Sequence, residues 1–123
     1  MKLGNFSLSI AVKDIAASLD FYQKLGFEIF GGNQEQGWLI LKNEAVMIGL
    51  FQGMFDENLM TFNPGWDSNA GEVEGYTDVR DIQKQLKESG ITPTMEVDED
   101  GSGPGHFIIK DPDGNVIMFD QHL

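Results

Sequence analysis

The stretch that most constrains the fold is residues 104–121, which have the pattern of a β-hairpin. Two strand-like apolar runs flank a turn sequence, DPDGN, at residues 111–115. Pro112 fixes one backbone torsion and Gly114 tolerates positive φ, so the chain reverses its direction there. We therefore predict that the two apolar runs pair as an antiparallel hairpin (residues 106–109 and 116–119).

An earlier segment repeats the start of this hairpin. Residues 37–43 (GWLILKN) have the same pattern as residues 105–111 (GHFIIKD), and the tripeptides VKD and VRD at residues 12–14 and 79–81 recur in the same order. Each tripeptide precedes an amphipathic stretch. The repeat predicts an α+β fold of two tandem units, each with the order strand, helix, strand, strand, strand.

The first half opens with a strand and a helix. Residues 5–13 alternate between apolar and small side chains, which is typical of a half-buried strand. Asp14 occupies an N-cap position and Gly26 a terminating position around a helix of about three turns. Because a helix needs an apolar surface to pack on, one face of the strand is expected to meet one face of the helix. The strand face is Leu8, Ile10 and Val12, opposite Ser7, Ser9 and Ala11, and the helix face is Ile15, Leu19, Tyr22 and Leu25.

The rest of the first half predicts strands and one unusual loop. Residues 27–30 read as a strand, residues 31–33 as a turn, and residues 37–41 with 45–51 as a hairpin. Residues 53–69 contain too many large apolar side chains for a plain linker. This segment folds either against a pocket or partner, or over the core.

The second half predicts the same order of elements. The expected elements are a strand at residues 72–79, a helix capped by Asp81 and ended by Gly90, a strand at residues 91–97, a flexible acidic loop at residues 98–103, and the closing hairpin.

Composition excludes several classes of protein. With 123 residues and 41% hydrophobic content, the chain suits one domain with a core. It has no cysteine, so disulfides and thiolate metal sites are excluded. The formal charge of −12 makes nucleic acid and membranes unfavourable partners. With no signal peptide or membrane-spanning run, we expect a cytoplasmic protein.

At this point the sequence resembles the vicinal oxygen chelate superfamily, which includes glyoxalase I, bleomycin-resistance proteins and extradiol dioxygenases. The motifs that carry the resemblance are VKD at residues 12–14, followed by FY at 21–22 and LGF at 25–27, and the sequence DPDGNVI at 111–117. The resemblance implies two βαβββ modules that form a cupped, barrel-like sheet with helices outside, commonly in a homodimer. The modules are expected at about residues 1–52 and 71–123, with a linking loop at residues 53–70.

The resemblance also implies four metal-ligand positions, which are poorly filled here. Aligned on the tripeptides and the closing hairpin, they fall on Ser7, Glu74, Met118 and a position near Gly49. Only Glu74 carries a side chain that suits a hard divalent ion. We therefore predict no cofactor and no metal site, with a divalent metal held by Glu74 as the weaker alternative.

The candidate site residues are chosen from the predicted strand faces that lie away from the helices and from the aromatic loop. No catalytic residue is assigned, but Glu74 and His106 form a candidate acid–base pair, and His122 is a less favoured addition. Trp38 reads equally well as core, whereas Phe27, Phe107 and Phe119 are expected in the core. The predicted ligand-binding residues are Ser7, Ser9, Trp38, Phe62, Trp66, Glu74, Tyr76, His106 and Met118.

Three functions remain open from the sequence. The favoured one is metal-independent binding of a small, partly apolar or aromatic molecule, as in bleomycin-resistance proteins. The alternative is a metal-dependent lyase, isomerase or dioxygenase of the same superfamily with a non-standard ligand set. A third reading is an interaction module whose acidic surface docks a basic partner.

Overall fold

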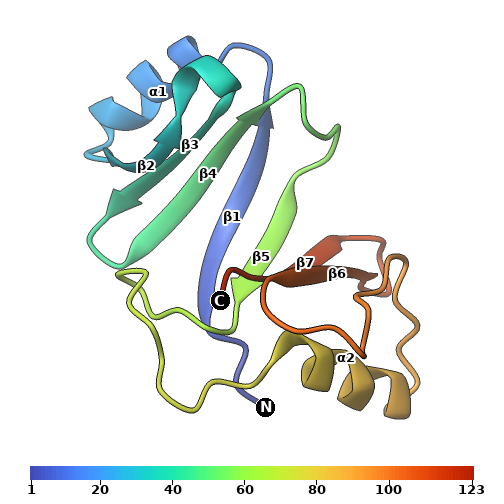
Figure 1. Cartoon of the computed structure of the whole chain (residues 1–123). Helices are drawn as coiled ribbons and strands as arrows, with labels where there is room; N and C mark the ends of the chain where they lie inside the picture. The colour runs from blue at the N-terminus through green and yellow to red at the C-terminus, as the bar shows by residue number, and fades with distance from the viewer. The chain divides into compact units, whose positions relative to one another are not determined.

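The structure is a computed structural model that describes residues 1–123. The chain divides into two compact units, and each is described by itself. The first unit is Ser7–Leu59, and the second combines Met1–Phe6 with Met60–Leu123. Figure 1 labels the strands and helices. They are β1 (Asn5–Val12), α1 (Ile15–Lys24), β2 (Glu28–Asn33), β3 (Trp38–Asn43), β4 (Val46–Gln52), β5 (Leu59–Asn63), α2 (Val79–Glu88), β6 (Gly105–Lys110) and β7 (Val116–Gln121), with a short 3-10 helix at Gln34–Gln36.

The first unit contains one complete strand–helix–strand–strand–strand module. Its strands lie in the order β2-β3-β4-β1, with β1 parallel to β4 and the other pairs antiparallel. Asp14 caps α1 as predicted, since its carboxylate accepts the Ala17 N–H at 3.2 Å. Gly26 follows the last turn of α1 with φ +98°, which confirms it as the terminator.

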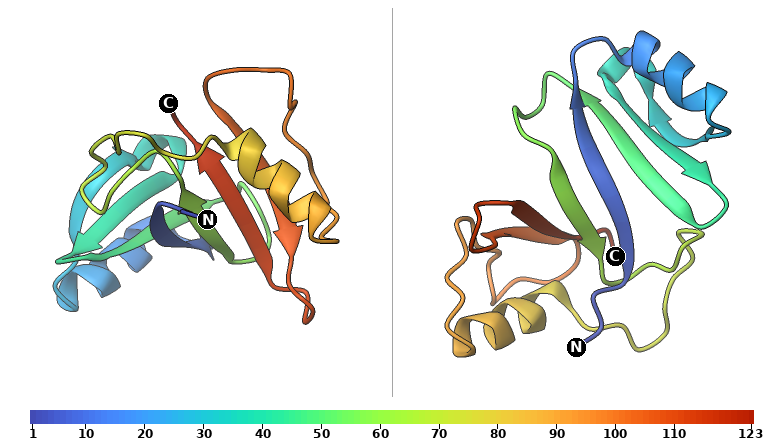
Figure 2. Two further views of the ribbon diagram at one scale, coloured as in Figure 1. Left: turned by 90° about the horizontal axis from the view of Figure 1, so that it is seen from below. Right: turned by 180° about the vertical axis from the view of Figure 1, so that it is seen from behind.

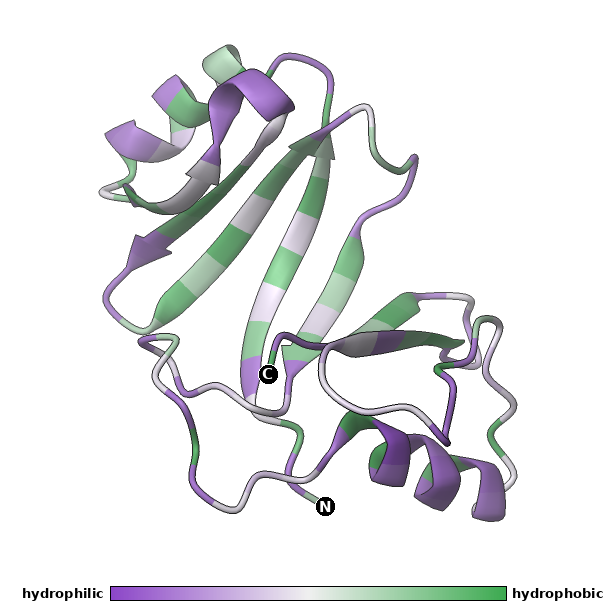
Figure 3. Cartoon of the chain, viewed as in Figure 1, coloured by the Kyte–Doolittle hydropathy of each residue, from purple (hydrophilic) through white to green (hydrophobic).

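The predicted packing of β1 on α1 is confirmed, with one exception. Leu8, Ile10 and Val12 pack against the buried cluster that includes Ile15, and the alternation of β1 is visible in Figure 3 as green and pale bands. Leu25 was expected on the buried face of the helix, but it is the C-cap residue and is 58% exposed. The helix ends before it can turn Leu25 toward the sheet.

The turn expected at residues 31–33 lies further along the chain. β2 continues through Asn33, with a bulge between Ile29 and Gly31. The reversal is made by the 3-10 helix, which Asn33 caps and which ends at Gly37 with φ +87°. The two glycines therefore form the bulged end of a strand and not the turn itself.

The second unit packs α2 on the antiparallel pair β6–β7. Its strands lie in the order β5-β7-β6, and Figure 2 shows α2 running along β6 and β7. The closing hairpin forms as predicted, with Phe107 opposite Phe119 and Ile109 opposite Ile117. Phe107, Ile109 and Phe119 belong to the buried cluster that packs on α2, and Ile117 packs against it, so Phe107 and Phe119 are confirmed as core residues.

The strand predicted at residues 72–79 is absent. Residues 73–78 are turn and coil, and the first strand of this unit is β5, which lies within residues 53–69, where the sequence predicts a loop. Gly75 has φ +69°, which is incompatible with an extended strand. The N-cap of α2 is Asp78 and not Asp81, because the Asp78 carboxylate accepts the Arg80 N–H at 2.9 Å.

The strand predicted at residues 91–97 is reduced to one bridge, between Met95 and Ile108. The buried side chain of Gln83 explains the change, because its amide pairs with both the N–H and the carbonyl of Val97. Gln83 accepts the Val97 N–H at 2.8 Å and donates to the Val97 carbonyl at 3.0 Å. A side chain on α2 thus takes the place of the next strand-pairing partner.

The acidic loop at residues 98–103, expected to be flexible, is bound to a buried guanidinium. Arg80 is 7% exposed and donates to the carbonyls of Asp98 (3.1 Å) and Gly103 (3.0 Å) and to the Asp78 carboxylate (3.2 Å). Burial raises the pKa of Asp78, but hydrogen bonds from the Arg80 backbone, the Gln121 amide and the Arg80 guanidinium together lower it below 3.8.

The same glutamine contact ties each helix to the last strand of its unit. The Gln52 side chain at the end of β4 accepts the Ile15 N–H at 2.8 Å, and Gln121 at the end of β7 accepts the Val79 N–H at 2.8 Å. Each bond satisfies an N–H in the first turn of a helix, which has no partner within the helix. The match supports the duplication inferred from sequence. None of the helices has the length and the hydropathy that a membrane-spanning helix needs.

The two glutamines differ in burial, and this predicts unequal effects of substitution. Gln121 is 1% exposed, and its side chain makes four hydrogen bonds, whereas Gln52 is exposed and makes one. Gln121→Met should lower the free energy of unfolding by about 2–4 kcal/mol because it leaves buried polar groups unpaired, and Gln52→Met by about 1 kcal/mol. Urea unfolding measures both, and equal losses would contradict the account.

Candidate functional site

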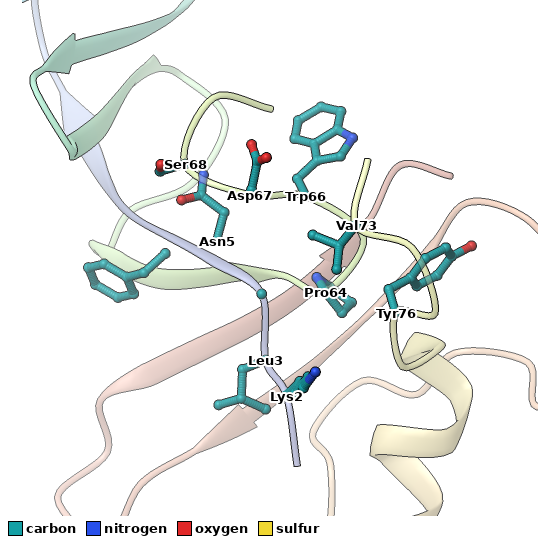
Figure 4. A pocket seen from close by; sticks show the side chains of 11 residues that line it. Lys2, Leu3, Asn5, Pro64, Trp66, Asp67, Ser68, Val73 and Tyr76 are labelled. Carbon is teal, nitrogen blue, oxygen red and sulfur yellow. The ribbon is translucent and has the colours of Figure 1, made fainter. Parts of the chain in front are cut away.

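The second unit contains a pocket of about 510 Å³. Its lining comes from residues 2–6 on one side and from the loop at residues 64–76 on the other (Figure 4). Most of the lining is apolar or aromatic, and polar groups lie among it. The apolar and aromatic members include Leu3, Pro64, Trp66, Val73 and Tyr76, and the charged members are Lys2 and Asp67.

A small hairpin shapes the loop wall. Trp66 bridges Glu72 in an antiparallel arrangement, and the Val73 N–H donates to the Gly65 carbonyl at 2.9 Å. The turn between them is closed by Asp67, whose carboxylate accepts the N–H groups of Asn69 (2.8 Å) and Gly71 (2.9 Å). This Asx-type turn fixes the positions of Trp66 and Val73 in the lining.

The N-terminal wall depends on a close backbone approach at Gly4. A Cβ atom at this position would lie 1.9 Å from the Asn63 carbonyl oxygen, and its φ is +79°. Only glycine permits this contact. The next residue, Asn5, donates its N–H to the Trp66 carbonyl at 3.0 Å, so the two walls are joined by a backbone hydrogen bond.

Trp66 also contacts His122. Their rings are stacked, with centroids 4.6 Å apart and planes at 10°. The His122 Nε2–H donates to the Asp120 carboxylate at 3.2 Å. The hydrogen bond from His122 to Asp120 raises the pKa of the imidazole above 6.5, against the opposing effect of its partial burial.

Phe62, predicted to bind a ligand, lies in a row of aromatic rings. It stacks on Phe119 at 5.7 Å and contacts Phe6 at 5.2 Å, and Phe119 in turn stacks on Phe107 at 4.6 Å. Phe62 also packs against the buried cluster under α2. Its contacts are those of a core residue, and its role in ligand binding remains a prediction.

The other candidates of the second unit are dispersed. Tyr76 lines the pocket with Trp66. Glu74 is exposed in a turn, so the alternation of a strand at residues 72–79, which would place it on the same face as Tyr76, does not apply. His106 is exposed on β6 opposite Asp120, and Met118 is half-buried opposite Ile108. The proposed Glu74–His106 acid–base pair has no structural contact that supports it.

The candidates of the first unit lie on the face of its sheet away from α1. Ser9 is 4% exposed and neighbours Gly49 across the strands, while Trp38 is half-buried and opposite Phe51. A Cβ atom at Gly49 would lie 2.5 Å from the Phe51 ring. Ser7 is half-buried on the same face of β1 as Ser9. This face is therefore filled with aromatic and small side chains around Gly49.

Sequence reasoning missed several residues that shape the pocket. Leu3 and Pro64 lie in segments without strand or helix periodicity, and Val73 falls in the predicted strand that does not form. The sequence NPG at residues 63–65 is typical of a turn beside the pocket. Asn63 is 7% exposed, and its side-chain oxygen is buried without a hydrogen-bond partner.

The family of this chain follows from comparison with known proteins. The family profile of the Glyoxalase/Bleomycin resistance protein/Dioxygenase superfamily matches residues 5–119, and the chain belongs to this superfamily. No curated protein matches the sequence.

Solved structures with the same fold have low sequence identity. A superfamily member from Vibrio splendidus 12B01 is 18% identical, with a TM-score of 0.66 over 95% of this chain and 97% of the other. Methylmalonyl-CoA epimerase from Streptomyces coelicolor is 17% identical, with a TM-score of 0.63 over 98% and 99%. An extradiol ring-cleaving dioxygenase from B. fuscum is 17% identical, with a TM-score of 0.56 over 99% of this chain and 32% of the other. They establish the fold and nothing more.

The residues at the family's metal-ligand positions do not fit a divalent ion. The first strand of the second unit is β5, so Glu74, which lies in a turn beyond β5, is not the second-module equivalent of Ser7 on β1. Gly49 and Met118 precede the two matching glutamines at equal intervals. Glycine supplies no side-chain donor, a serine hydroxyl and a thioether suit a hard divalent ion poorly, and no group of three His, Asp or Glu side chains comes together.

The poor fit of these residues to a divalent ion predicts that the protein holds little or no metal. Protein purified without chelators should contain far less than one equivalent of Mn, Fe, Ni or Zn by elemental analysis. Added metal ions should leave the midpoint of thermal unfolding unchanged. A stoichiometric ion that is lost in Glu74→Ala but kept in Glu72→Ala, an exposed carboxylate nearby, would contradict the account.

Proposed function

We propose that this superfamily member binds a small, partly apolar or aromatic molecule without a metal ion. The observation that carries the proposal is the pocket whose lining includes Trp66 and Tyr76. Its volume of about 510 Å³ falls within the range of small-molecule sites, which are mostly apolar with a few polar groups. Two of the nine residues predicted to bind a ligand therefore lie in one cavity.

The chemistry of the lining indicates the class of ligand. Aromatic side chains offer flat surfaces for stacking on a planar ring. Leu3, Pro64 and Val73 add apolar contacts, and Lys2 and Asp67 place one charge of each sign in the lining. A planar molecule with one polar substituent matches this arrangement best.

The superfamily context is compatible with binding but does not select a reaction. The solved structures include an epimerase with a CoA ligand and a ring-cleaving dioxygenase, so one fold serves several chemistries. The metal-dependent alternative would need Glu74, which is exposed in a turn. We also propose a homodimer, as the resemblance implies, and light scattering after size exclusion tests it. The cytoplasmic location, expected because the sequence has no signal peptide, stays a prediction.

Binding can be tested with N-phenyl-1-naphthylamine, a neutral aromatic probe that fluoresces in apolar surroundings. We expect saturable binding at one site per chain. Trp66→Ala and Tyr76→Ala should each weaken it by about tenfold or more, because aromatic anchors dominate binding in such sites. Phe21→Ala is the matched control, since this phenylalanine is 58% exposed on α1 and lies outside the pocket.

Two outcomes of the binding experiment would contradict the proposal. If the probe does not bind, or if Trp66→Ala and Phe21→Ala bind it as tightly as the unaltered protein, the pocket is not the binding site and the proposal fails. Circular dichroism of each variant separates a loss of binding from a loss of folding.

A further inference from the structure

The contact between Trp66 and His122 connects the pocket to an ionisable group. Trp66 lines the pocket, and the His122 imidazole lies parallel to its indole at 4.6 Å. The same imidazole is held on its Nε2 side by the Asp120 carboxylate at 3.2 Å. One wall of the pocket is therefore supported by a ring that is itself anchored to β7.

We propose that His122 is a positioning residue for this pocket: protonated, it fixes the Trp66 indole for ligand binding, and deprotonation loosens that wall. The proposal rests on the proposed function, because it concerns the same cavity. An imidazolium interacts favourably with the face of an indole and forms a charge-assisted hydrogen bond with a carboxylate. A neutral imidazole loses both advantages, so the indole is less restrained and ligand binding must restrain it.

The surrounding charges favour the protonated form. Asp120 is the direct partner, and His106 lies across from Asp120 on β6. On the loop that carries Trp66, the charged groups are Asp67, Glu72 and Glu74, all acidic, and β5 has none. The pKa of His122 is higher in the folded protein than in the unfolded chain. Protonated His122 therefore stabilises the fold fully below pH 6.5, and this stabilisation is lost as the pH rises through the folded-state pKa.

The ligand-free protein gives the first test. The chain has two tryptophans and two histidines, so Trp38→Phe leaves Trp66 as the only indole. A protonated imidazole quenches an indole stacked on it, so the fluorescence of this variant should rise between pH 5 and 9 with one midpoint above that of a free histidine. The transition should vanish in His122→Phe, move to lower pH in Asp120→Asn, and persist in His106→Gln.

Binding of N-phenyl-1-naphthylamine, which stays neutral over this pH range, gives the second test. Affinity should be about three- to fivefold higher at pH 6 than at pH 9 in the unaltered protein. His122→Phe keeps an aromatic ring but cannot titrate, so its affinity should not vary with pH. His122→Ala removes the stack and should bind weakly at both values.

The two tests distinguish the role of His122 from ligand binding in the pocket. If Trp66 fluorescence does not titrate, or titrates equally in His122→Phe, then protonated His122 does not position Trp66, whatever the pocket binds. If fluorescence titrates as expected but affinity is independent of pH, His122 is structural and the proposal is overturned. If the probe fails to bind at any pH, the proposed function fails, while the fluorescence titration still decides whether His122 holds Trp66.

Discussion

In each unit the first N–H of the helix donates a hydrogen bond to a glutamine at the end of a strand. This hydrogen bond fixes where each helix begins on its sheet. In the second unit Gln121 joins β7 to Val79 and also donates to the Asp78 carboxylate at 3.1 Å and to the Gly103 carbonyl at 3.0 Å. One buried side chain thus fixes the start of α2, the end of the sheet and the loop between them. Because Gln52 makes the same contact in the first unit, the two halves can be aligned by structure.

The structure changes the assignment of the family's metal-ligand positions. Aligning the tripeptides selected Glu74 as the one plausible metal ligand, whereas the equivalent position belongs on β5 and Glu74 lies in a turn beyond it. The difference arises because residues 64–78 separate β5 from α2, whereas only residues 13 and 14 separate β1 from α1. No carboxylate then remains among the assigned positions Ser7, Gly49 and Met118. The chain has instead an aromatic pocket, which is lined by the N-terminal segment and by the loop that follows β5.

The sequence predicted the parts of the fold that depend on local patterns. The turn at residues 111–115, the alternation of Leu8, Ile10 and Val12, and the cap at Asp14 all have short-range causes and were found. The strand predicted at residues 91–97 does not form because the amide of Gln83, on α2, takes the backbone groups of Val97. The strand predicted at residues 72–79 does not form because Gly75 turns the chain with a positive φ.

The candidate site was harder to predict for the same reason. Trp66 was selected as a large aromatic side chain in a long loop and Tyr76 by the alternation of a predicted strand, and both line the pocket. Leu3 carried no signal, since its place in the lining depends on the contact of Gly4 with Asn63. That contact brings together segments that are far apart in the chain, which no periodicity can show.

The most direct test of a metal-independent aromatic pocket is a crystal structure of the protein grown with both N-phenyl-1-naphthylamine and a manganese salt, with anomalous data collected for manganese. The account predicts electron density for the probe against Trp66 and Tyr76, and no ordered ion at Ser7, Gly49 or Met118. An anomalous peak bound at those positions, with the pocket empty, would contradict it.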